Sequence, residues 1–147
     1  MAEGMVVRGN ESGPFKASGR DTDGRFDLFV MDVDYAFGPP LHTHTAQEDS
    51  FYVVDGVLTV QLGDDIIELA AGDFASAAPG VSHTFTNTQA DRAVRMVNLM
   101  TPGIGFDQYI QQLIVDTPPE PAVMEKLNQE FGVQMVGPPL SHKLGLL

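Results

Sequence analysis

The chain of 147 residues is long enough for one domain with a substantial apolar core, whereas two domains would each bury too little. Its 8 Lys and Arg residues against 20 Asp and Glu residues give a net charge of -12, which repels phosphate backbones and anionic lipids. We therefore expect a small-molecule ligand, with neither nucleic acid nor membrane as a partner. The lack of cysteine excludes disulfides and thiolate metal sites.

Residues 1–14 are polar and rich in glycine, which predicts a flexible N-terminal arm. They do not combine a basic segment with an apolar segment, as a secretory signal peptide does. The sequence also lacks an apolar run of membrane-spanning length. We therefore expect a cytoplasmic protein.

Residues 15–101 consist of short runs of β-branched and aromatic residues separated by turn signals. Residues 25–37 alternate and predict one long strand, residues 51–74 predict three strands, and residues 83–88 and 92–101 predict two more. Turn-forming pairs such as Asp55-Gly56 and Gly63-Asp64 divide the central group. Evenly spaced strands without intervening helices are typical of an antiparallel sandwich or barrel.

The C-terminal part changes to a helical period. Apolar residues recur at helical spacing in residues 105–114 and again in residues 117–132. The second helix opens with a proline-rich segment and is followed by Gly132, a natural residue to end a helix. The tetrapeptide GPPL occurs at 38–41 and at 137–140, which we interpret as chance because the flanking residues do not match.

Three histidines and two acids form a candidate metal site. His42 and His44 are two residues apart, so on a strand their imidazoles project to the same side. His83 follows the turn expected at residues 79–80, and Glu48 or Asp49 can return to the same space from the neighbouring strand. Three neutral imidazoles and one carboxylate suit a divalent ion such as Fe, Ni, Mn, Co or Zn.

Only one of the two acids is expected to join the histidines, because adjacent residues of a strand face opposite sides. Aspartate is shorter than glutamate by one methylene, about 1.5 Å of C–C bond. If Asp49 does not reach the metal, three histidines hold it, and Asp49 orients a water molecule or acts as a base.

These residues resemble the paired motifs of the cupin superfamily. His42 and His44 match the first motif, in which four residues lead to Asp49 and six more lead to Gly56. This spacing favours Asp49 over Glu48 as the ligand, although the family usually has glutamate at this place. The second motif is matched by a set of four residues, namely Gly72, Gly80, His83 and Asn87. The sequence departs from it at Ala78, where the family has proline.

The resemblance implies an all-β fold: a conical, jelly-roll-like cupin β-barrel of two antiparallel sheets. Residues 15–101 would form the barrel, and residues 102–147 a C-terminal helical segment and tail packed on it. It also implies one divalent metal, held by His42, His44, Asp49 and His83, and usually a homodimer. Exposed sheet edges near the N-terminus are consistent with a dimer.

Within the superfamily, segments such as PPLHTH and MTPGIGFDQYIQQL are similar to the small quercetin 2,3-dioxygenase-like cupins. This similarity implies a dioxygenase that cleaves a flavonol-like or hydroxy-carbonyl substrate, with Asp49 (or Glu48) as metal ligand and proton acceptor. Two alternatives remain open. The protein is an oxygen-independent metal-dependent isomerase, cyclase or lyase, or it is a non-catalytic cupin that binds a small ligand.

Other residues have simpler interpretations. His142 lies in a polar, basic tail and is expected to be solvated, and Asn87 is expected to fix a turn or a neighbouring strand. Phe51 and Phe85 are equally consistent with a pocket wall and with barrel core. Met31, Met96 and Met100 are expected to fill the core.

Overall fold

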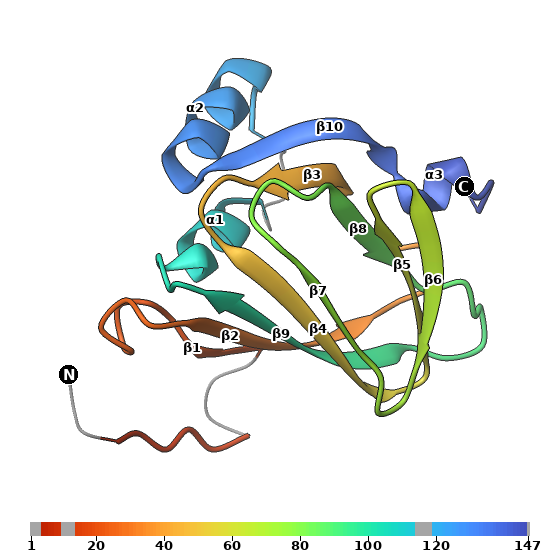
Figure 1. Cartoon of the computed structure of the whole chain (residues 1–147), viewed down its shortest axis with the longest axis horizontal. Helices are drawn as coiled ribbons and strands as arrows, with labels where there is room; N and C mark the ends of the chain where they lie inside the picture. Colours follow the sequence, from red (N-terminus) through yellow and green to blue (C-terminus); the bar gives the residue numbers. More distant parts are fainter. Residues whose placement is uncertain (1–3, 10–13, 114–118, 147) are drawn as a thin grey trace.

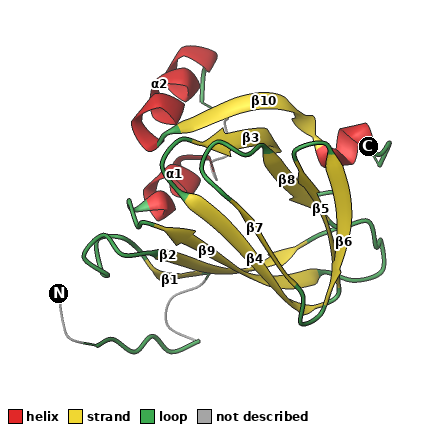
Figure 2. Ribbon diagram, viewed as in Figure 1, coloured by secondary structure: helices red, strands yellow, loops and turns green. Residues whose placement is uncertain are grey.

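The computed structural model describes residues 4–9, 14–113 and 119–146. Two five-stranded antiparallel sheets face each other, with strand orders β1-β2-β9-β4-β7 and β10-β3-β8-β5-β6 (Figures 1 and 2). The strands are β1 (Phe15–Ala17), β2 (Asp27–Val33), β3 (Pro40–His44), β4 (Glu48–Asp55), β5 (Val57–Leu62), β6 (Asp65–Ala70), β7 (Phe74–Ala77), β8 (His83–Thr86), β9 (Val94–Thr101) and β10 (Val133–Pro139). The predicted all-β class is confirmed.

Three helices follow the barrel strands: α1 (Phe106–Leu113), α2 (Pro121–Phe131) and α3 (Leu140–Lys143). Gly132 ends α2 in the left-handed conformation, with φ of 69°, as predicted. None of the helices in the described part of the chain is long and apolar enough to span a membrane.

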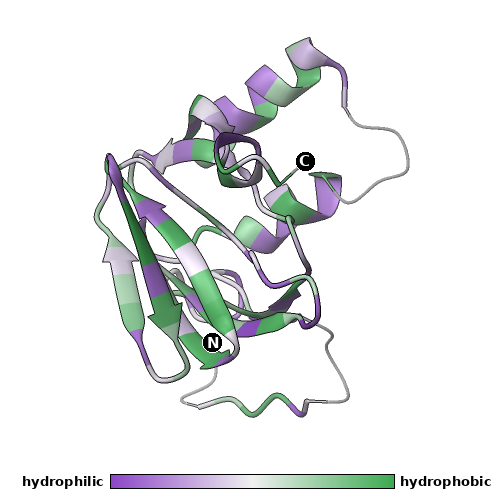
Figure 3. Cartoon of the chain, turned by 90° about the vertical axis from the view of Figure 1, so that its right-hand side faces the viewer, coloured by the Kyte–Doolittle hydropathy of each residue, from purple (hydrophilic) through white to green (hydrophobic). Residues whose placement is uncertain are grey.

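Alternating burial along the strands creates the interior, and apolar and polar bands alternate along the ribbons of Figure 3. One apolar cluster fills the barrel around Phe51, Leu58 and Met96. A second cluster lies where α1 and α2 pack on the strands, around Phe29, Phe106, Tyr109, Leu127 and Phe131. The helices therefore close one end of the space between the sheets.

The predicted strand over 25–37 is too long. β2 ends at Val33, and residues 34–39 cross the outer side of β8 instead. The hydroxyls of Thr84 and Thr86 donate to the carbonyl oxygens of Pro39 and Phe37, at 2.6 and 2.8 Å. Gly38 permits this close crossing, because a Cβ there would meet the Phe85 carbonyl oxygen at 2.0 Å.

The C-terminal segment also contains a strand that the sequence did not predict. β10 extends the second sheet by pairing with β3, and Met135 lies opposite His42. Gly137, Pro138 and Pro139 argue against a strand in the sequence, but prolines are compatible with an edge strand, which β10 is. The two GPPL segments meet here, since Pro139 pairs with Pro40.

Of the expected N-terminal arm, residues 4–9 and 14 belong to the described part of the chain, and residues 4–9 form neither helix nor strand. The first strand starts at Phe15.

Candidate metal centre

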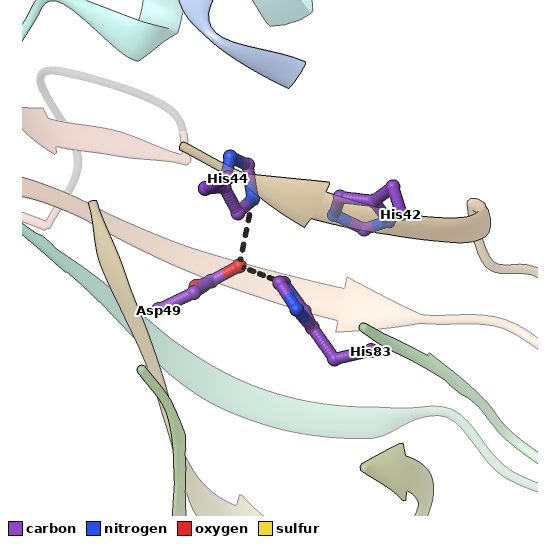
Figure 4. Close-up of side chains that lie close together, drawn as sticks. All are labelled: His42, His44, Asp49 and His83. Carbon is purple, nitrogen blue, oxygen red and sulfur yellow. Dashed lines mark hydrogen bonds and ion pairs between the residues drawn. The ribbon is translucent and has the colours of Figure 1, made fainter. Parts of the chain in front are cut away.

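Four side chains from three strands meet between the two sheets. His42 and His44 lie on β3, His83 lies on β8, and Asp49 comes from β4 in the opposite sheet (Figure 4). Each residue offers a ligand atom, and these atoms all lie within 4.8 Å of one another. All four residues are buried, with at most 8% of their surface exposed.

Strand register brings the three imidazoles together. His42 pairs directly with His83 across β3 and β8, and His44 follows two residues later on the same side. The ring centroids are 4.4 to 5.1 Å apart. The Gly80 amide, in the turn before β8, donates to the His44 carbonyl oxygen at 2.9 Å. This bond joins the segment that carries His83 to the strand that carries the other two histidines.

Backbone carbonyl groups determine which nitrogen two of the imidazoles present to the centre. Nδ1 of His42 lies 2.8 Å from the Pro40 carbonyl oxygen, and Nδ1 of His83 lies 2.9 Å from that of Val81. A carbonyl oxygen only accepts, so Nδ1 carries the proton and donates in both residues. In a neutral ring, the lone pair is then on Nε2, the arrangement typical of a metal-binding histidine.

Asp49 reaches the histidines despite its short side chain. Its Oδ2 lies 2.9 Å from His83 Nε2 and 3.2 Å from His44 Nε2. Its backbone pairs with Ala77 of β7 and Met100 of β9, so the residue lies on an inner strand of its sheet. The aspartate side chain, although one methylene shorter than glutamate, is therefore long enough to contact these two histidines.

Glu48 is not part of this cluster. It is exposed, and its Oε2 accepts a hydrogen bond from the Ser76 hydroxyl at 2.6 Å. Adjacent residues of β4 face opposite sides, so Asp49 points inward and Glu48 outward. Glu48, which the sequence left open as an alternative, therefore lies where it cannot meet the three imidazoles.

Asn98 is a member of the site that the sequence interpretation missed. Its Nδ2 donates to Asp49 Oδ1 at 2.5 Å and to the Ser50 carbonyl oxygen at 3.0 Å. One carboxylate oxygen is thus held by an amide while the other faces the histidines. The sequence did contain a signal for a buried polar role of Asn98. The other inward residues of β9 are apolar, namely Val94, Met96 and Met100, and Asn98 lies among them.

The shifted pKa values follow from burial and from these contacts. Burial, with the neighbouring imidazoles of His83 and His44, lowers the pKa of His42 to about 4. Burial would lower the pKa of His83 too, but the Asp49 carboxylate outweighs it and the pKa is raised. Burial would raise the pKa of Asp49, yet hydrogen bonds with His44 and His83 leave it well below its usual range. Asp49 is therefore charged and His42 neutral near pH 7.

Aromatic rings separate the cluster from solvent on two sides. Phe106 of α1 packs edge-on against His44, with ring centroids 5.3 Å apart, and Phe51 lies 6.0 Å from His83. Phe106 belongs to the apolar cluster beneath the helices and Phe51 to the barrel core. The four polar side chains are thus enclosed between two apolar clusters, where charge interactions are strong.

The remaining candidates have structural roles. Asn87 donates to the carbonyl oxygens of Val33 and Arg92, at 3.0 and 2.7 Å, as expected for a residue that fixes a neighbouring strand. Phe51, Phe85 and Met96 belong to the barrel core, which confirms the core interpretation. His142 is exposed on α3, as expected for a solvated residue.

The donor set fits a divalent transition metal. Three imidazoles with inward-facing nitrogen atoms and one carboxylate are ligands for borderline ions. Without a metal, three buried imidazole rings lie around the single negative charge of Asp49. The cluster of His42, His44, Asp49 and His83 can hold a metal ion, whose identity the donor types do not determine.

Comparisons with known proteins agree with this architecture. The Cupin domain family model matches residues 29–100, which include all four clustered residues and Asn98. No curated protein matches the sequence.

Solved structures share the fold at low sequence identity. A predicted oxalate decarboxylase from Thermotoga maritima is 18% identical, with a TM-score of 0.60, over 65% of this chain and 97% of that one. An uncharacterized double-stranded β-helix protein from Klebsiella pneumoniae is 22% identical, with a TM-score of 0.55, over 67% and 80%. KdgF from Halomonas sp. is 19% identical, with a TM-score of 0.54, over 61% and 76%. Residues 29–100 are thus similar to the Cupin domain, and the paired five-stranded sheets have the fold of these solved structures.

Proposed function

We propose that this cupin is a cytoplasmic metal-dependent dioxygenase that acts on a small flavonol-like or hydroxy-carbonyl substrate. The observation that carries the proposal is the buried cluster of three imidazoles and one carboxylate, all contributed from inside the barrel. The similarity of the sequence to quercetinase-like cupins supports the choice of reaction.

His42, His44, His83 and Asp49 would hold the metal. A divalent ion held there would supply Lewis acidity toward an ionised substrate oxygen and the capacity for reaction with dioxygen. Asp49 contributes the negative charge of the ligand set, and its depressed pKa keeps that charge at neutral pH. Phe106 and Phe51 pack beside His44 and His83 and keep bulk water away from the cluster.

The substrate loses a proton, so the reaction needs a base. The contacts of Asp49 limit its ability to act as that base. One of its oxygen atoms is held by Asn98 and the other faces two histidines, an arrangement suited to a ligand. Tyr109 is no substitute, because burial raises its pKa to about 12 and its hydroxyl donates to Asn128 at 2.6 Å. Asp49 acts as base only if it releases one of its partners.

A second candidate, which the sequence leaves open, is an oxygen-independent isomerase, cyclase or lyase, and it needs a proton acceptor as well. Such an enzyme uses the metal to polarise a hydroxy-carbonyl group. A third candidate is a protein that binds a small ligand without turnover. The first two candidates use the same four residues, so the experiment has to separate the reactions and also test whether ligand binding needs the metal site.

The first experiment measures metal content by mass spectrometry in the wild type, His44→Ala and His142→Ala. We expect a bound ion in the wild type and in His142→Ala, and its loss in His44→Ala. His142 is the matched control, because it is the fourth histidine of the chain and lies outside the cluster. Wild-type protein that takes up no divalent transition metal would contradict the metal site itself.

The second experiment measures oxygen uptake after loading with each metal, using flavonols and other hydroxy-enones. Uptake that requires His44 supports the dioxygenase. Turnover under strict anaerobiosis supports the isomerase, cyclase or lyase instead. A ligand that binds without turnover, with equal affinity in the wild type and His44→Ala, supports a binding protein that has no functional metal.

A further inference from the structure

A groove of about 390 Å³ lies between the β3–β4 connection and the helices, and none of the four clustered residues lines it. We call it the glutamine groove, and it is lined by residues 45–47, Ile104, Gln108 and residues 129–132. In Figure 1 the β3–β4 connection lies beside α1 and below α2. The volume is within the range of small-molecule sites, so the groove can hold a ligand of its own.

One buried amide of the glutamine groove has an oxygen atom without a partner. Gln47 is only 2% exposed, and its Nε2 donates to the Pro102 carbonyl oxygen at 2.7 Å and to Asp27 Oδ2 at 3.1 Å. A carbonyl oxygen only accepts, so the amide nitrogen faces Pro102 and Oε1 faces another way. Oε1 has no hydrogen-bond partner in the described part of the chain. Buried acceptors are normally paired, so this atom is available to a donor from a ligand.

The carboxylate of Asp27 holds this amide in its orientation. Asp27 is fully buried and accepts hydrogen bonds from the backbone amides of Gly19, Ile104 and Gly105, at 2.6, 3.0 and 3.1 Å. The Gln47 amide completes this set of donors, and hydrogen bonds to a carboxylate are among the strong ones. Turning the amide to pair Oε1 elsewhere would break two existing bonds. The donor therefore has to come to Gln47.

The walls of the glutamine groove are held together by the chain itself. The Thr45 amide donates to the Gly132 carbonyl oxygen at 2.8 Å, which joins the end of β3 to the end of α2. Gly132 permits this close approach, because a Cβ there would meet Thr45 Oγ1 at 2.5 Å. Phe131 packs against Phe106 of α1, with ring centroids 6.4 Å apart. A preformed groove of this kind loses little conformational freedom when a ligand binds.

The lining favours a neutral ligand that carries hydroxyl groups. The exposed amides of Gln108 and Gln129 and the hydroxyl of Thr45 can each donate and accept hydrogen bonds. Glu130 is the single charged residue among the described residues that line the groove. Together with the net charge of -12 it disfavours anions. One exposed carboxylate contributes little to the binding of a cation, because water screens it.

We propose that the glutamine groove binds a neutral ring with several hydroxyl groups, which is the chemistry of a monosaccharide or of a small phenol. One ligand hydroxyl donates to Gln47 Oε1, and others contact the amides of Gln108 and Gln129. Ile104, which is 41% exposed, offers apolar surface to the ring. The site is additional to the metal centre and does not depend on the proposed reaction.

Nuclear magnetic resonance titration of the full chain tests the proposal, with glucose and resorcinol as separate probes. A chelator in the sample excludes binding through a metal. We expect at least one probe to bind with roughly millimolar affinity, which is typical of ligands with about ten heavy atoms. The backbone amide signals of residues 45–47 and 129–132 should shift. Shifts with glucose alone would indicate a sugar ligand, and shifts with resorcinol alone a phenolic one. Glucuronate and dihydroxybenzoate, their anionic counterparts, should bind severalfold less tightly.

Variants of the lining residues provide the second test. Gln108→Ala should weaken binding of the same probe by about fivefold, the effect of one hydrogen bond. Gln111→Ala is the matched control, because Gln111 is also an exposed glutamine of α1 but does not line the groove, and it should bind as the wild type does. Gln47→Met removes the unpaired acceptor and should weaken binding at least as much. Circular dichroism checks whether it folds; if it does not, Gln108→Ala decides.

Several results would overturn the proposal. The absence of shifts with both probes, at about ten times the expected dissociation constant, would mean that solvent alone satisfies Gln47. Wild-type affinity in Gln108→Ala, or in folded Gln47→Met, would exclude the glutamine groove as the binding site. Shifts centred on the four clustered residues, or tighter binding of the anionic counterparts, would also contradict it.

Discussion

Asp49 carries the negative charge of the four-residue cluster, and each of its oxygen atoms has a partner: Asn98 on one side, His44 and His83 on the other. Its neighbour Glu48 has the longer side chain but faces solvent. At this scale the site depends on which of two adjacent acids points inward, and the pleat of β4 decides it.

Replacing Asp49 by asparagine should abolish tight metal binding, because the side chain keeps its shape but loses the charge that offsets a divalent ion. Isothermal titration with Zn²⁺ or Ni²⁺ measures the effect. Glu48→Gln is the matched control and should bind as the wild type does. Equal affinity in Asp49→Asn and the wild type would exclude Asp49 as a ligand.

Asn98→Leu should weaken metal binding by about tenfold to a hundredfold, the usual effect of removing a group that orients a ligand. Asn98→Asp should weaken it further, since a second carboxylate would face Asp49 Oδ1 at the position of the amide. Asn87→Leu is the control, because Asn87 is a buried amide bonded to two carbonyl groups and lies outside the cluster. It should lower stability and leave the metal affinity unchanged.

The low pKa of His42 links stability to pH in the metal-free protein. Between pH 6.5 and about 4 the unfolded chain binds a proton at this residue and the folded chain does not. Stability should therefore fall as the pH falls through this window, by roughly 3 kcal/mol in all. Urea unfolding in the presence of a chelator measures the slope. His42→Asn should flatten it and His142→Asn should not; an unchanged slope in His42→Asn would contradict the assignment.

Among the elements, α1 has the most direct relation to the site. It places Phe106 against His44 on one side and against Tyr109 and Phe131 on the other, at centroid distances of 5.3, 4.8 and 6.4 Å. The helix thus joins β3, which carries His42 and His44, to the apolar contacts of α2.

Phe106→Ala should destabilise the protein by about 3–5 kcal/mol, as for other buried phenylalanines. It should also speed the removal of metal by a chelator, because it removes the ring that covers His44. Phe85→Ala is the matched control: Phe85 is equally buried, at 7% against 6%, but belongs to the barrel core. Similar loss of stability in both variants with faster metal loss only in Phe106→Ala would support a covering role. Equal metal-release rates would contradict it.

At the scale of the whole molecule, the cluster connects the two sheets. Three candidate ligands belong to the second sheet, and Asp49 belongs to the first. A bound ion would therefore oppose separation of the sheets, in addition to its local contacts.

Metal loading should raise the melting temperature. A ligand at a hundred times its dissociation constant stabilises the folded state by about 2.7 kcal/mol. In a domain of this size that corresponds to about 5–10 °C. Differential scanning calorimetry with and without a chelator measures the shift, which should disappear in Asp49→Asn. A shift that persists in that variant would place the stabilising ion elsewhere.

The sequence by itself determined the fold class, the approximate strands and the three clustered histidines, and it favoured Asp49 over Glu48 as the acid that joins them. Alternation and turn residues follow from local chemistry, and the spacing of His42 and His44 indicates that they share one side of a strand. Gly132 at the end of α2 was equally predictable, because a left-handed residue has a local cause.

Tertiary structure decided what depends on pairing between distant segments. β10 is a strand because β3 offers it hydrogen bonds, not because its own residues favour one. The partnership of Asn98 with Asp49 and the inward direction of Asp49 depend on the register of β4 with β9. The row of Val30, Val97, Tyr52 and Phe74 exists because four separate strands align their outward residues. Such features are absent from the local sequence, since the groups that stabilise them lie tens of residues apart.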